Sequence, residues 1–315
     1  MNSPTIKKSQ KLSNIKTNRL IFYSIMIAVP VFHFLIFYVY INFNSILLSL
    51  KEYSLADMGG YVWEFAGLKN FATAWQVLTS RGYLIKNSLI FLASDCLIIT
   101  PLAVLFSFYL YKKAPLSGFF KVILFLPQLL SGVILGLLYK YLASDVYLWF
   151  VDKLHITVNG GLLDSAKTAL GATLAFNIFM GFGVNVLLFV GAMSGVNTSV
   201  VESAKIDGAS SLQELWYIVL PLTSPTIITV LIIYISHVFT NQYNMYTLFG
   251  TGALDIQTVG YFLYCQTLES KLAGTRDNIF TYPVLSAMGI ILTAIILPIT
   301  ILFRWLMNKY GPSTD

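Results

Sequence analysis

The chain has few charged residues. Lys, Arg, Asp and Glu make up 11% of its 315 residues, whereas 57% are hydrophobic and 15% are aromatic. The mean hydropathy is +0.73. Soluble domains carry about 25% charged residues. This scarcity of charge excludes a soluble fold and predicts a membrane protein.

Cysteine and histidine are also scarce, and so are sequence signatures of catalysis. Cys96 and Cys265 make neither a disulfide framework nor a zinc site, and the three histidines lie too far apart for a local metal motif. No Gly-Lys dipeptide occurs, so the phosphate-binding loop Gly-x-x-x-x-Gly-Lys-Ser/Thr is absent. No Ser, His and Asp set stands in a recognisable nucleophile context. We therefore expect no catalytic residue, no metal, no cofactor and no ATP hydrolysis by this chain, and a membrane enzyme is a weak alternative.

Six stretches between charged residues are long enough to cross a bilayer. A crossing helix needs about 20 mostly apolar residues. The first stretch is too long for the apolar region of a cleaved signal peptide and is retained as a span. The sequence predicts an all-α protein with a six-helix membrane domain over residues 20–310. Its transmembrane helices are predicted near 20–43, 87–111, 118–142, 169–193, 217–241 and 281–306.

The distribution of Lys and Arg along the chain indicates its orientation in the membrane. A net charge of +6 fits nucleic acid, an anionic membrane face or membrane orientation. Lys and Arg near span ends favour the cytoplasm, and the basic cluster before the first span and the pair Lys112-Lys113 fall on one side. We therefore predict a cell-membrane protein with both termini cytoplasmic, no nucleic-acid partner, and residues 51–86, 143–166 and 242–280 outside. The first 19 residues are predicted to form a basic cytoplasmic arm, flexible or lying on the surface.

One inner loop, Gly195 to Tyr217, breaks this charge pattern because Glu202, Asp207 and Glu214 outnumber its single Lys205. Two of these acids stand three residues after a serine. The pairs Ser199 with Glu202 and Ser211 with Glu214 have capping-box spacing, which predicts two short helices.

Gly208 stands between these two predicted helices, where a left-handed backbone ends one helix and turns the chain into the next. The loop is therefore predicted to be a helix-turn-helix elbow. Pro221 suits the start or a kink of the helix that follows.

The elbow carries a long motif. The string from Glu202 to Ala209, followed after eight residues by Ile-Val-Leu-Pro at 218–221, resembles the EAA motif of the membrane subunits of binding-protein-dependent ABC importers. Ser203 replaces the usual alanine. Further stretches are similar to the carbohydrate-type permeases of this group. They are Phe65–Phe71, Asn87-Ser88, Phe125-Leu126-Pro127 and the Ala-x-Ile-Asp-Gly-Ala form at 204–209.

This resemblance implies a type I ABC importer-like transmembrane domain with a cytoplasmic coupling helix in the segment 195–221. The implied partners are a second permease, either a homologous different chain or a copy of this one, two cytoplasmic ABC ATPases and an extracytoplasmic solute-binding protein that delivers a carbohydrate. The motif position gives Glu202 a charged contact with the ATPase and gives Gly208 the turn of the coupling helix. Ala204, Asp207 and Ala209 support their packing. A role for Glu202 in capping its own helix is the alternative.

Helical spacing indicates a candidate solute pathway. Asn177, Gly181 and Asn185 recur every four residues in the fourth span, and a second set falls at i, i+3, i+4 and i+7 in the fifth. Amides and an imidazole offer hydrogen bonds to hydroxyl groups, and a phenol ring offers a face to a sugar. Such a lining suits a neutral, polyhydroxylated solute, although polar residues also join helices within membrane bundles. The fifth-span set is Tyr234, His237, Val238 and Asn241.

Asp95 is the one acid inside a predicted span, where ionisable groups are costly and usually functional. It is interpreted either as a packing residue of the bundle or as a proton relay or solute contact. An ion-coupled carrier usually has more ionisable residues inside the membrane than this one. Such a carrier is therefore the more distant alternative. The nearer alternative is an importer for another solute, such as a glycerol phosphate or a polyol.

Overall fold

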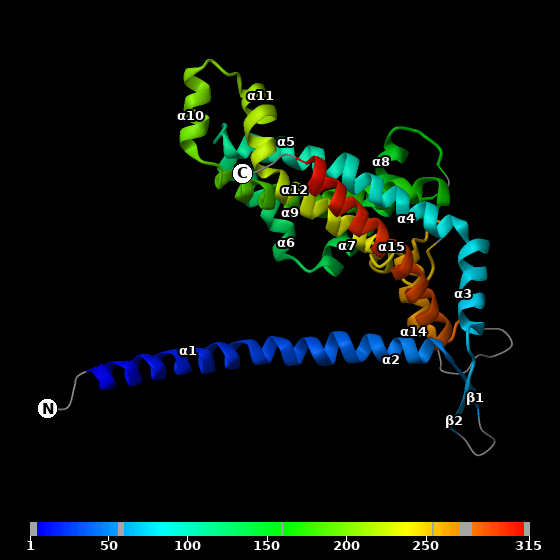
Figure 1. Cartoon of the computed structure of the whole chain (residues 1–315). Helices are drawn as coiled ribbons and strands as arrows, with labels where there is room; N and C mark the ends of the chain where they lie inside the picture. Colours follow the sequence, from blue (N-terminus) through cyan, green and yellow to red (C-terminus); the bar gives the residue numbers. More distant parts are fainter. Residues whose placement is uncertain (1–4, 56–59, 159, 254, 271–278, 312–315) are drawn as a thin grey trace. The chain divides into compact units, whose positions relative to one another are not determined.

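The computed structural model describes residues 5–55, 60–158, 160–253, 255–270 and 279–311. The chain forms two compact units. The first comprises Met1–Thr73 and Lys271–Ile290, and the second comprises Ala74–Ser270 and Ile291–Asp315. Figure 1 draws the helices that make up both units.

The first unit begins with a long helical rod and continues into a small hairpin. The rod consists of α1 (Thr5–Phe34), the π-helical η1 (Leu35–Tyr40) and α2 (Ile41–Ser49), and the hairpin pairs β1 (Lys51–Leu55) with β2 (Tyr61–Phe65) in antiparallel register. Helix α3 (Lys69–Ser80) follows. Asn70 is buried, and its Nδ2 donates hydrogen bonds of 2.8 Å to the carbonyl oxygens of both Ser49 and Lys51. This amide joins the end of the rod to the hairpin.

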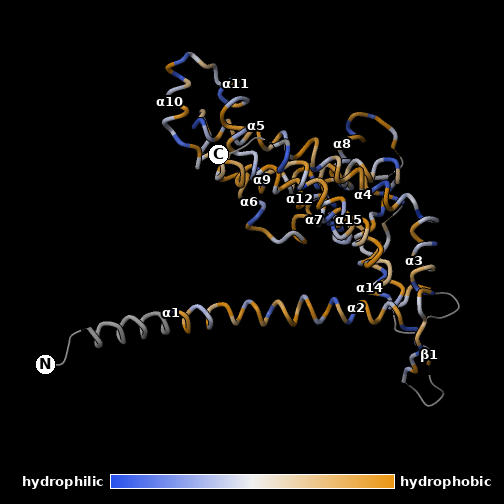
Figure 2. Tube along the Cα trace, viewed as in Figure 1, coloured by the Kyte–Doolittle hydropathy of each residue, from blue (hydrophilic) through white to orange (hydrophobic). Residues whose placement is uncertain are grey.

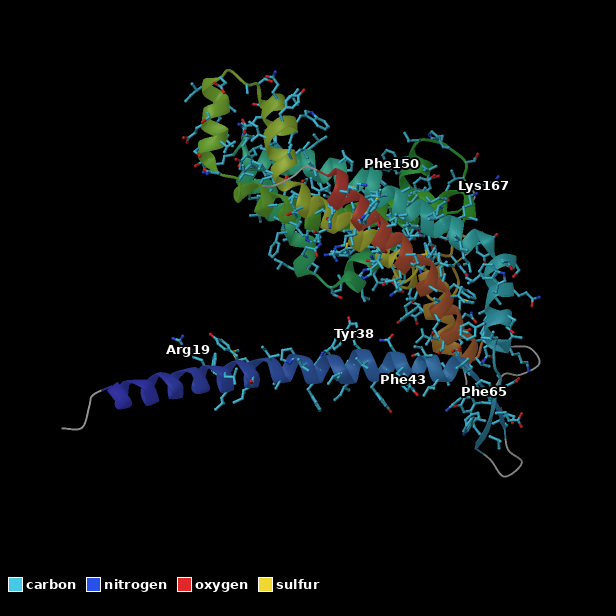
Figure 3. All side chains as sticks on the ribbon, in the orientation of Figure 1. Arg19, Tyr38, Phe43, Phe65, Phe150 and Lys167 are labelled. Atoms are coloured by element: carbon cyan, nitrogen blue, oxygen red, sulfur yellow. The ribbon has the colours of Figure 1, made fainter. Side chains whose placement is uncertain are left out.

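The rod is apolar over most of its length. Residues Arg19–Ser49 are long and hydrophobic enough to cross a membrane, and the hydrophobic colour dominates from α1 to α2 in Figure 2. Its large side chains are exposed, and Tyr38 and Phe43 project from the helix in Figure 3. The arm predicted from the sequence over residues 1–19 is described from residue 5 onward. Residues 5–19 are helical and continuous with the span.

The second unit is a helix bundle in which three pairs of α-helices run on through a π-helical turn. The continuous helices span Gly82–Tyr111, Gly132–Lys153 and Ser211–His237. The elements are α4 (Gly82–Ser94), η2 (Asp95–Ile99), α5 (Thr100–Tyr111), α6 (Ser117–Leu129), α7 (Gly132–Tyr141), η3 (Leu142–Val146), α8 (Tyr147–Lys153), α9 (Ala166–Ser194), α10 (Thr198–Ile206), α11 (Ser211–Glu214), η4 (Leu215–Val219), α12 (Leu220–His237), α13 (Met245–Phe249) and α14 (Val259–Glu269). Helix α15 (Tyr282–Tyr310) runs through parts of both units.

Proline accounts for the two π turns η2 and η4. A proline has no N–H, and its ring clashes with the carbonyl four residues earlier, so the preceding turn of an α-helix must open. In both helices the backbone N–H of the residue just before the proline bonds to the carbonyl five residues earlier. The N–H of Thr100 reaches the carbonyl of Asp95 ahead of Pro101, and that of Leu220 reaches Leu215 ahead of Pro221.

Helix α9 packs against α5, α6, α12 and η2. Buried Ser107 on α5 donates from Oγ to the carbonyl of Val186 on α9, at 2.9 Å. Gly183 lets α6 approach the same helix, because a Cβ there would lie 2.5 Å from the carbonyl oxygen of Leu124. Contacts of this kind, with small or polar residues at helix crossings, are typical of membrane bundles.

Six helices among the described residues are long and apolar enough to span a membrane, as the sequence predicts. The third one departs from its expected position at 118–142. The chain there breaks at Leu130, which is extended, and restarts with Ser131, whose Oγ accepts a hydrogen bond of 3.3 Å from the N–H of Val133. The long candidate helix is Gly132–Lys153, and Ser117–Leu129 is a separate shorter apolar helix.

The fifth span also ends earlier than predicted. The helix stops at His237 rather than at 241, and the carbonyl of His237 accepts hydrogen bonds from the N–H groups of Thr240 and Asn241. Tyr243 and Asn244 then adopt positive φ angles of 50° and 57°. The chain therefore turns away before the predicted helical face is complete.

Candidate functional site

The elbow predicted between the fourth and fifth spans is present, with α10 and α11 as its two arms (Figure 1). Helix α10 begins at Thr198, and the side chain of Asn197 accepts a hydrogen bond of 3.0 Å from the N–H of Ser199. The predicted cap pair, Ser199 with Glu202, is therefore wrong. Glu202 lies inside α10, exposed, and does not begin or cap the helix.

Gly208 ends α10 in the manner predicted. Its φ is +81°, and two hydrogen bonds close the helix end: the N–H of Ala209 bonds to the carbonyl of Ala204 at 2.9 Å, and the N–H of Gly208 bonds to that of Lys205 at 3.1 Å. This pair of bonds is the Schellman arrangement, which needs a left-handed residue at the position of Gly208.

The second arm is capped one residue earlier than predicted. Ser210 and Gln213 form a reciprocal capping box, in place of Ser211 and Glu214. Helix α11 has four residues and continues directly through η4 into α12. The second arm of the elbow and the fifth span are therefore one piece of helix.

The motif residues lie on the outer part of the elbow. Glu202 and Asp207 are exposed, and Ala204 and Ala209 are half-buried. Large apolar side chains accompany them in an exposed position: Ile206 is 86% exposed, and Leu212, Trp216 and Tyr217 are exposed as well. Exposed apolar groups of this kind mark interaction surfaces.

A cleft of about 210 Å³ separates α10 from the end of α5. Glu214 lies at this cleft and is 2% exposed, and its Oε2 accepts a hydrogen bond of 2.6 Å from Nζ of Lys112. The sequence shows both charges but not their contact, because 102 residues separate them. The cleft is lined by Tyr111, Lys112, Lys113, Thr198, Val201, Glu202, Lys205 and Glu214.

Part of the predicted solute pathway comes together with Asp95. Asp95 is 4% exposed and lies at the start of η2. Its Oδ1 accepts a hydrogen bond of 2.8 Å from Nδ2 of Asn177 on α9. Within the described residues, Lys112–Glu214 and Lys69–Glu52 are the ion pairs, so this buried acid has a polar partner but no cation in contact.

A second polar contact lies two turns further along α9. Nδ2 of Asn185 donates to Oη of Tyr234 on α12 and to the carbonyl of Gly181, both at 2.7 Å. Gly181 itself faces Ile99 of η2, whose Cδ1 would lie 3.1 Å from an added Cβ. The three helical segments η2, α9 and α12 therefore meet at these polar side chains.

The remaining predicted pathway residues lie at the end of α12 and just beyond it. His237 is the last residue of the helix that carries Tyr234, and Val238 and Asn241 follow that helix end. His237 is exposed, Val238 is 1% exposed, and Oδ1 of Asn241 accepts the N–H of Tyr243 at 2.9 Å. Tyr243 was missed by the sequence analysis. Burial, followed by the charge of Asp95, raises the pKa of its phenol, which keeps it neutral.

The described residues contain no group of three or more His, Cys, Asp or Glu placed to hold a metal ion. We call the side chains of Asp95, Asn177, Asn185 and Tyr234 the polar layer. It offers hydrogen bonds from amides, a phenol and a carboxyl group. Such groups bind hydroxyls.

The polar pair Asn87-Ser88, noted in the sequence, holds the segment after α12 in place. Nδ2 of Asn87 donates to the carbonyls of Asp255 and Gln257, at 2.9 and 3.0 Å. Oγ of Ser88 accepts the N–H of Val259 at 2.9 Å. These residues position the loop rather than a solute.

The family model described as "Binding-protein-dependent transport system inner membrane component" matches residues 99–314. Among curated relatives, the chain is 29% identical over 192 residues to the "Probable starch degradation products transport system permease protein AmyD" of Thermoanaerobacterium thermosulfurigenes, covering 59% of this chain and 64% of that relative. It is 24% identical over 287 residues to the "Arabinooligosaccharides transport system permease protein AraP" of Bacillus subtilis, covering 89% and 86%.

A solved structure with a similar fold is a chain of a bacterial alginate ABC transporter, crystallised in complex with an alginate pentasaccharide-bound periplasmic protein. The TM-score is 0.75 at 20% sequence identity, and the alignment covers 94% of this chain and 96% of that chain. The likeness in fold extends over nearly the whole chain.

Proposed function

We infer that this chain, which belongs to the family of binding-protein-dependent transport system inner membrane components, is the permease subunit of an ATP-driven importer for a sugar or oligosaccharide. The match over residues 99–314 carries this conclusion, because it contains the elbow and the helices α9 and α12 with Asn177, Asn185 and Tyr234. The relatives named for starch degradation products and arabinooligosaccharides support a carbohydrate as the solute.

The polar layer supports a neutral solute. Asn177, Asn185 and Tyr234 offer amide and phenol groups, and no Lys or Arg accompanies them in the pathway set. A phosphate group needs cations or converging N–H donors, and the buried carboxyl of Asp95 opposes a negative charge. These side chains favour a sugar over a glycerol phosphate.

The elbow supports an external source of energy. We assign ATPase docking to its exposed surface, with Glu202 supplying the charged contact and Gly208 the turn. Ile206, 86% exposed, supplies apolar contact area. The complete importer then consists of this chain, a second permease, two cytoplasmic ATPases and an extracytoplasmic solute-binding protein.

The energy source is tested in proteoliposomes that contain the whole importer. We expect maltotriose or arabinotriose, offered on the cognate binding protein, to accumulate with ATP inside the vesicles. Uptake should stop with orthovanadate and persist with an ionophore that dissipates ion gradients. Glycerol 3-phosphate serves as the anionic comparison. Uptake that stops with the ionophore and survives vanadate would instead indicate an ion-coupled carrier.

The orientation of the chain, including the cytoplasmic arm 1–19, is tested by labelling. Cys96 and Cys265 are first replaced by Ala, and single cysteines are introduced as Lys69→Cys or Lys205→Cys, both at exposed positions. In intact cells an impermeant maleimide should modify position 69 and spare position 205. Permeabilised cells should show both labelled. The opposite pattern in intact cells contradicts the proposed topology.

A further inference from the structure

The buried ion pair between Lys112 and Glu214 joins two parts of the chain that the backbone does not connect nearby. Lys112 follows the last residue of α5, and Glu214 is the last residue of α11. Nζ and Oε2 are 2.6 Å apart, and the side chains are 26% and 2% exposed. The pair attaches the second arm of the elbow to the end of α5.

Glu214 depends on this lysine. Its second oxygen, Oε1, is buried and has no hydrogen-bond partner among the described residues. Removing the partner of a buried charge leaves that charge uncompensated, which is strongly unfavourable. Lys113 and Lys205 line the same cleft, but neither forms an ion pair with Glu214. Lys112 therefore supplies the charge compensation that the described structure gives to this acid.

The two helices that meet at this pair both lead to the polar layer. Helix α5 continues from η2 without a break, and Lys112 directly follows the end of this continuous helix, which contains Asp95. Glu214 continues through η4 into α12, which carries Tyr234. The elbow is thus joined covalently to the helix of Tyr234 and through the ion pair to the helix of Asp95.

We propose that the Lys112–Glu214 pair is a latch that makes the elbow, α5 and α12 move as one body. This rests on the proposed function, in which the elbow receives the movement of the ATPases. With the latch closed, displacement of the elbow reaches η2 as well as α12. Without it, the backbone passes the displacement to α9 and α12, and α5 follows through helix packing alone. The two residues are positioning residues for coupling, and neither contacts the solute.

The test uses the complete purified importer with its binding protein, loaded with whichever of maltotriose and arabinotriose stimulates the wild type. Glu214→Gln keeps the shape of the side chain and removes its charge, so it preserves the fold. Lys112→Met removes the other charge, and the double variant Lys112→Glu/Glu214→Lys reverses the pair. Lys113→Met is the matched control, because this neighbouring lysine lines the same cleft without an ion pair.

We expect Glu214→Gln and Lys112→Met to reduce the stimulation of ATP hydrolysis by the loaded binding protein about tenfold, a mid-range coupling in double-mutant cycles. Basal hydrolysis and the ratio of ATPase to permease should stay at the wild-type level. The reversed pair should recover most of the stimulation, and Lys113→Met should resemble the wild type. A pair that only neutralises a buried acid would leave Glu214→Gln at the wild-type level, because this variant has no acid to neutralise.

Normal stimulation in Glu214→Gln overturns the latch, whatever Lys112→Met does. A reversed pair that assembles fully but stays as uncoupled as the single variants overturns it too. Neither result affects the proposed function. That function fails if the wild-type importer shows no ATP hydrolysis responsive to a loaded binding protein.

Discussion

Replacing Gly208 with Val should reduce solute-stimulated ATP hydrolysis about tenfold or more while the chain still enters the membrane. The φ of +81° at Gly208 is the reason. A left-handed backbone costs L residues about 1–2 kcal/mol, and β-branched residues disfavour it most. No atom lies within 4 Å of an added Cβ, so the effect comes from the backbone and not from a clash. The Schellman bonds would be lost, and the two arms of the elbow would change direction.

Two controls separate this effect from a general loss of stability. Gly208→Asn should retain most of the coupling, because Asn tolerates the left-handed region. Gly191→Val adds the same side chain to α9, at an exposed glycine with no positive φ and no neighbouring atom within 4 Å of its Cβ, and should be mild. The measurement is hydrolysis by purified complexes with and without loaded binding protein. Normal stimulation in Gly208→Val would contradict a role for the turn.

The second large effect is expected at Asn177. Asn177→Leu approximately preserves volume but removes the 2.8 Å hydrogen bond to Oδ1 of Asp95, which is 4% exposed. Leaving a buried polar group unpaired costs about 1–3 kcal/mol, and more for a charged one. We therefore expect solute uptake to fall about tenfold or more. The ATPases should still co-purify, because the elbow lies at the end of α9 that follows Ser194.

The matched variants distinguish a pathway role from packing. Asp95→Asn keeps an acceptor for Asn177 and should be milder than Asn177→Leu. Val184→Leu changes an exposed apolar position on the same helix and should leave uptake unchanged. The readout is the concentration dependence of oligosaccharide uptake in proteoliposomes. Wild-type kinetics in Asn177→Leu would make the Asp95–Asn177 contact a packing feature alone.

Hydrophobicity was sufficient to predict most of the fold, because crossing the bilayer requires length and apolarity and little else. The third span was misplaced since Phe125 and Leu126 on one side of the break are as apolar as Val133 and Ile134 on the other. Leu130 ends one helix and Ser131 caps the next, and an average over composition does not register this.

The positions of helix caps were less predictable than the helices. Several residues near the start of α10 are able to cap it, and the sequence pattern favoured Ser199 although Asn197 has the geometry. At α11 the choice lay between adjacent serines, Ser210 and Ser211, and only the first faces the N–H of Gln213. Competing caps of similar strength leave such boundaries to tertiary packing.

The residues of the candidate site were likewise only partly predictable from the sequence. Asn177, Gly181 and Asn185 were predictable, because a long uninterrupted helix keeps its spacing. The contact of Glu214 with Lys112 was not, since no local pattern relates residues 102 positions apart. Asn241 lies beyond the end of α12, and the turn that follows includes Tyr243 and Asn244, which adopt positive φ without being glycine.

The π turn η2 has a consequence for the angular positions of side chains around its helix. Asp95 and Ser107 both bond to α9, through Asn177 and Val186, yet twelve residues at about 100° each place two side chains roughly 120° apart in a regular α-helix. A turn closed by a bond to the fifth residue back takes up one extra residue. The effective separation becomes eleven steps, which leaves a difference of about 20°. Pro101 therefore sets the rotational phase that lets a carboxylate and a hydroxyl, one on each side of the turn, face the same neighbour.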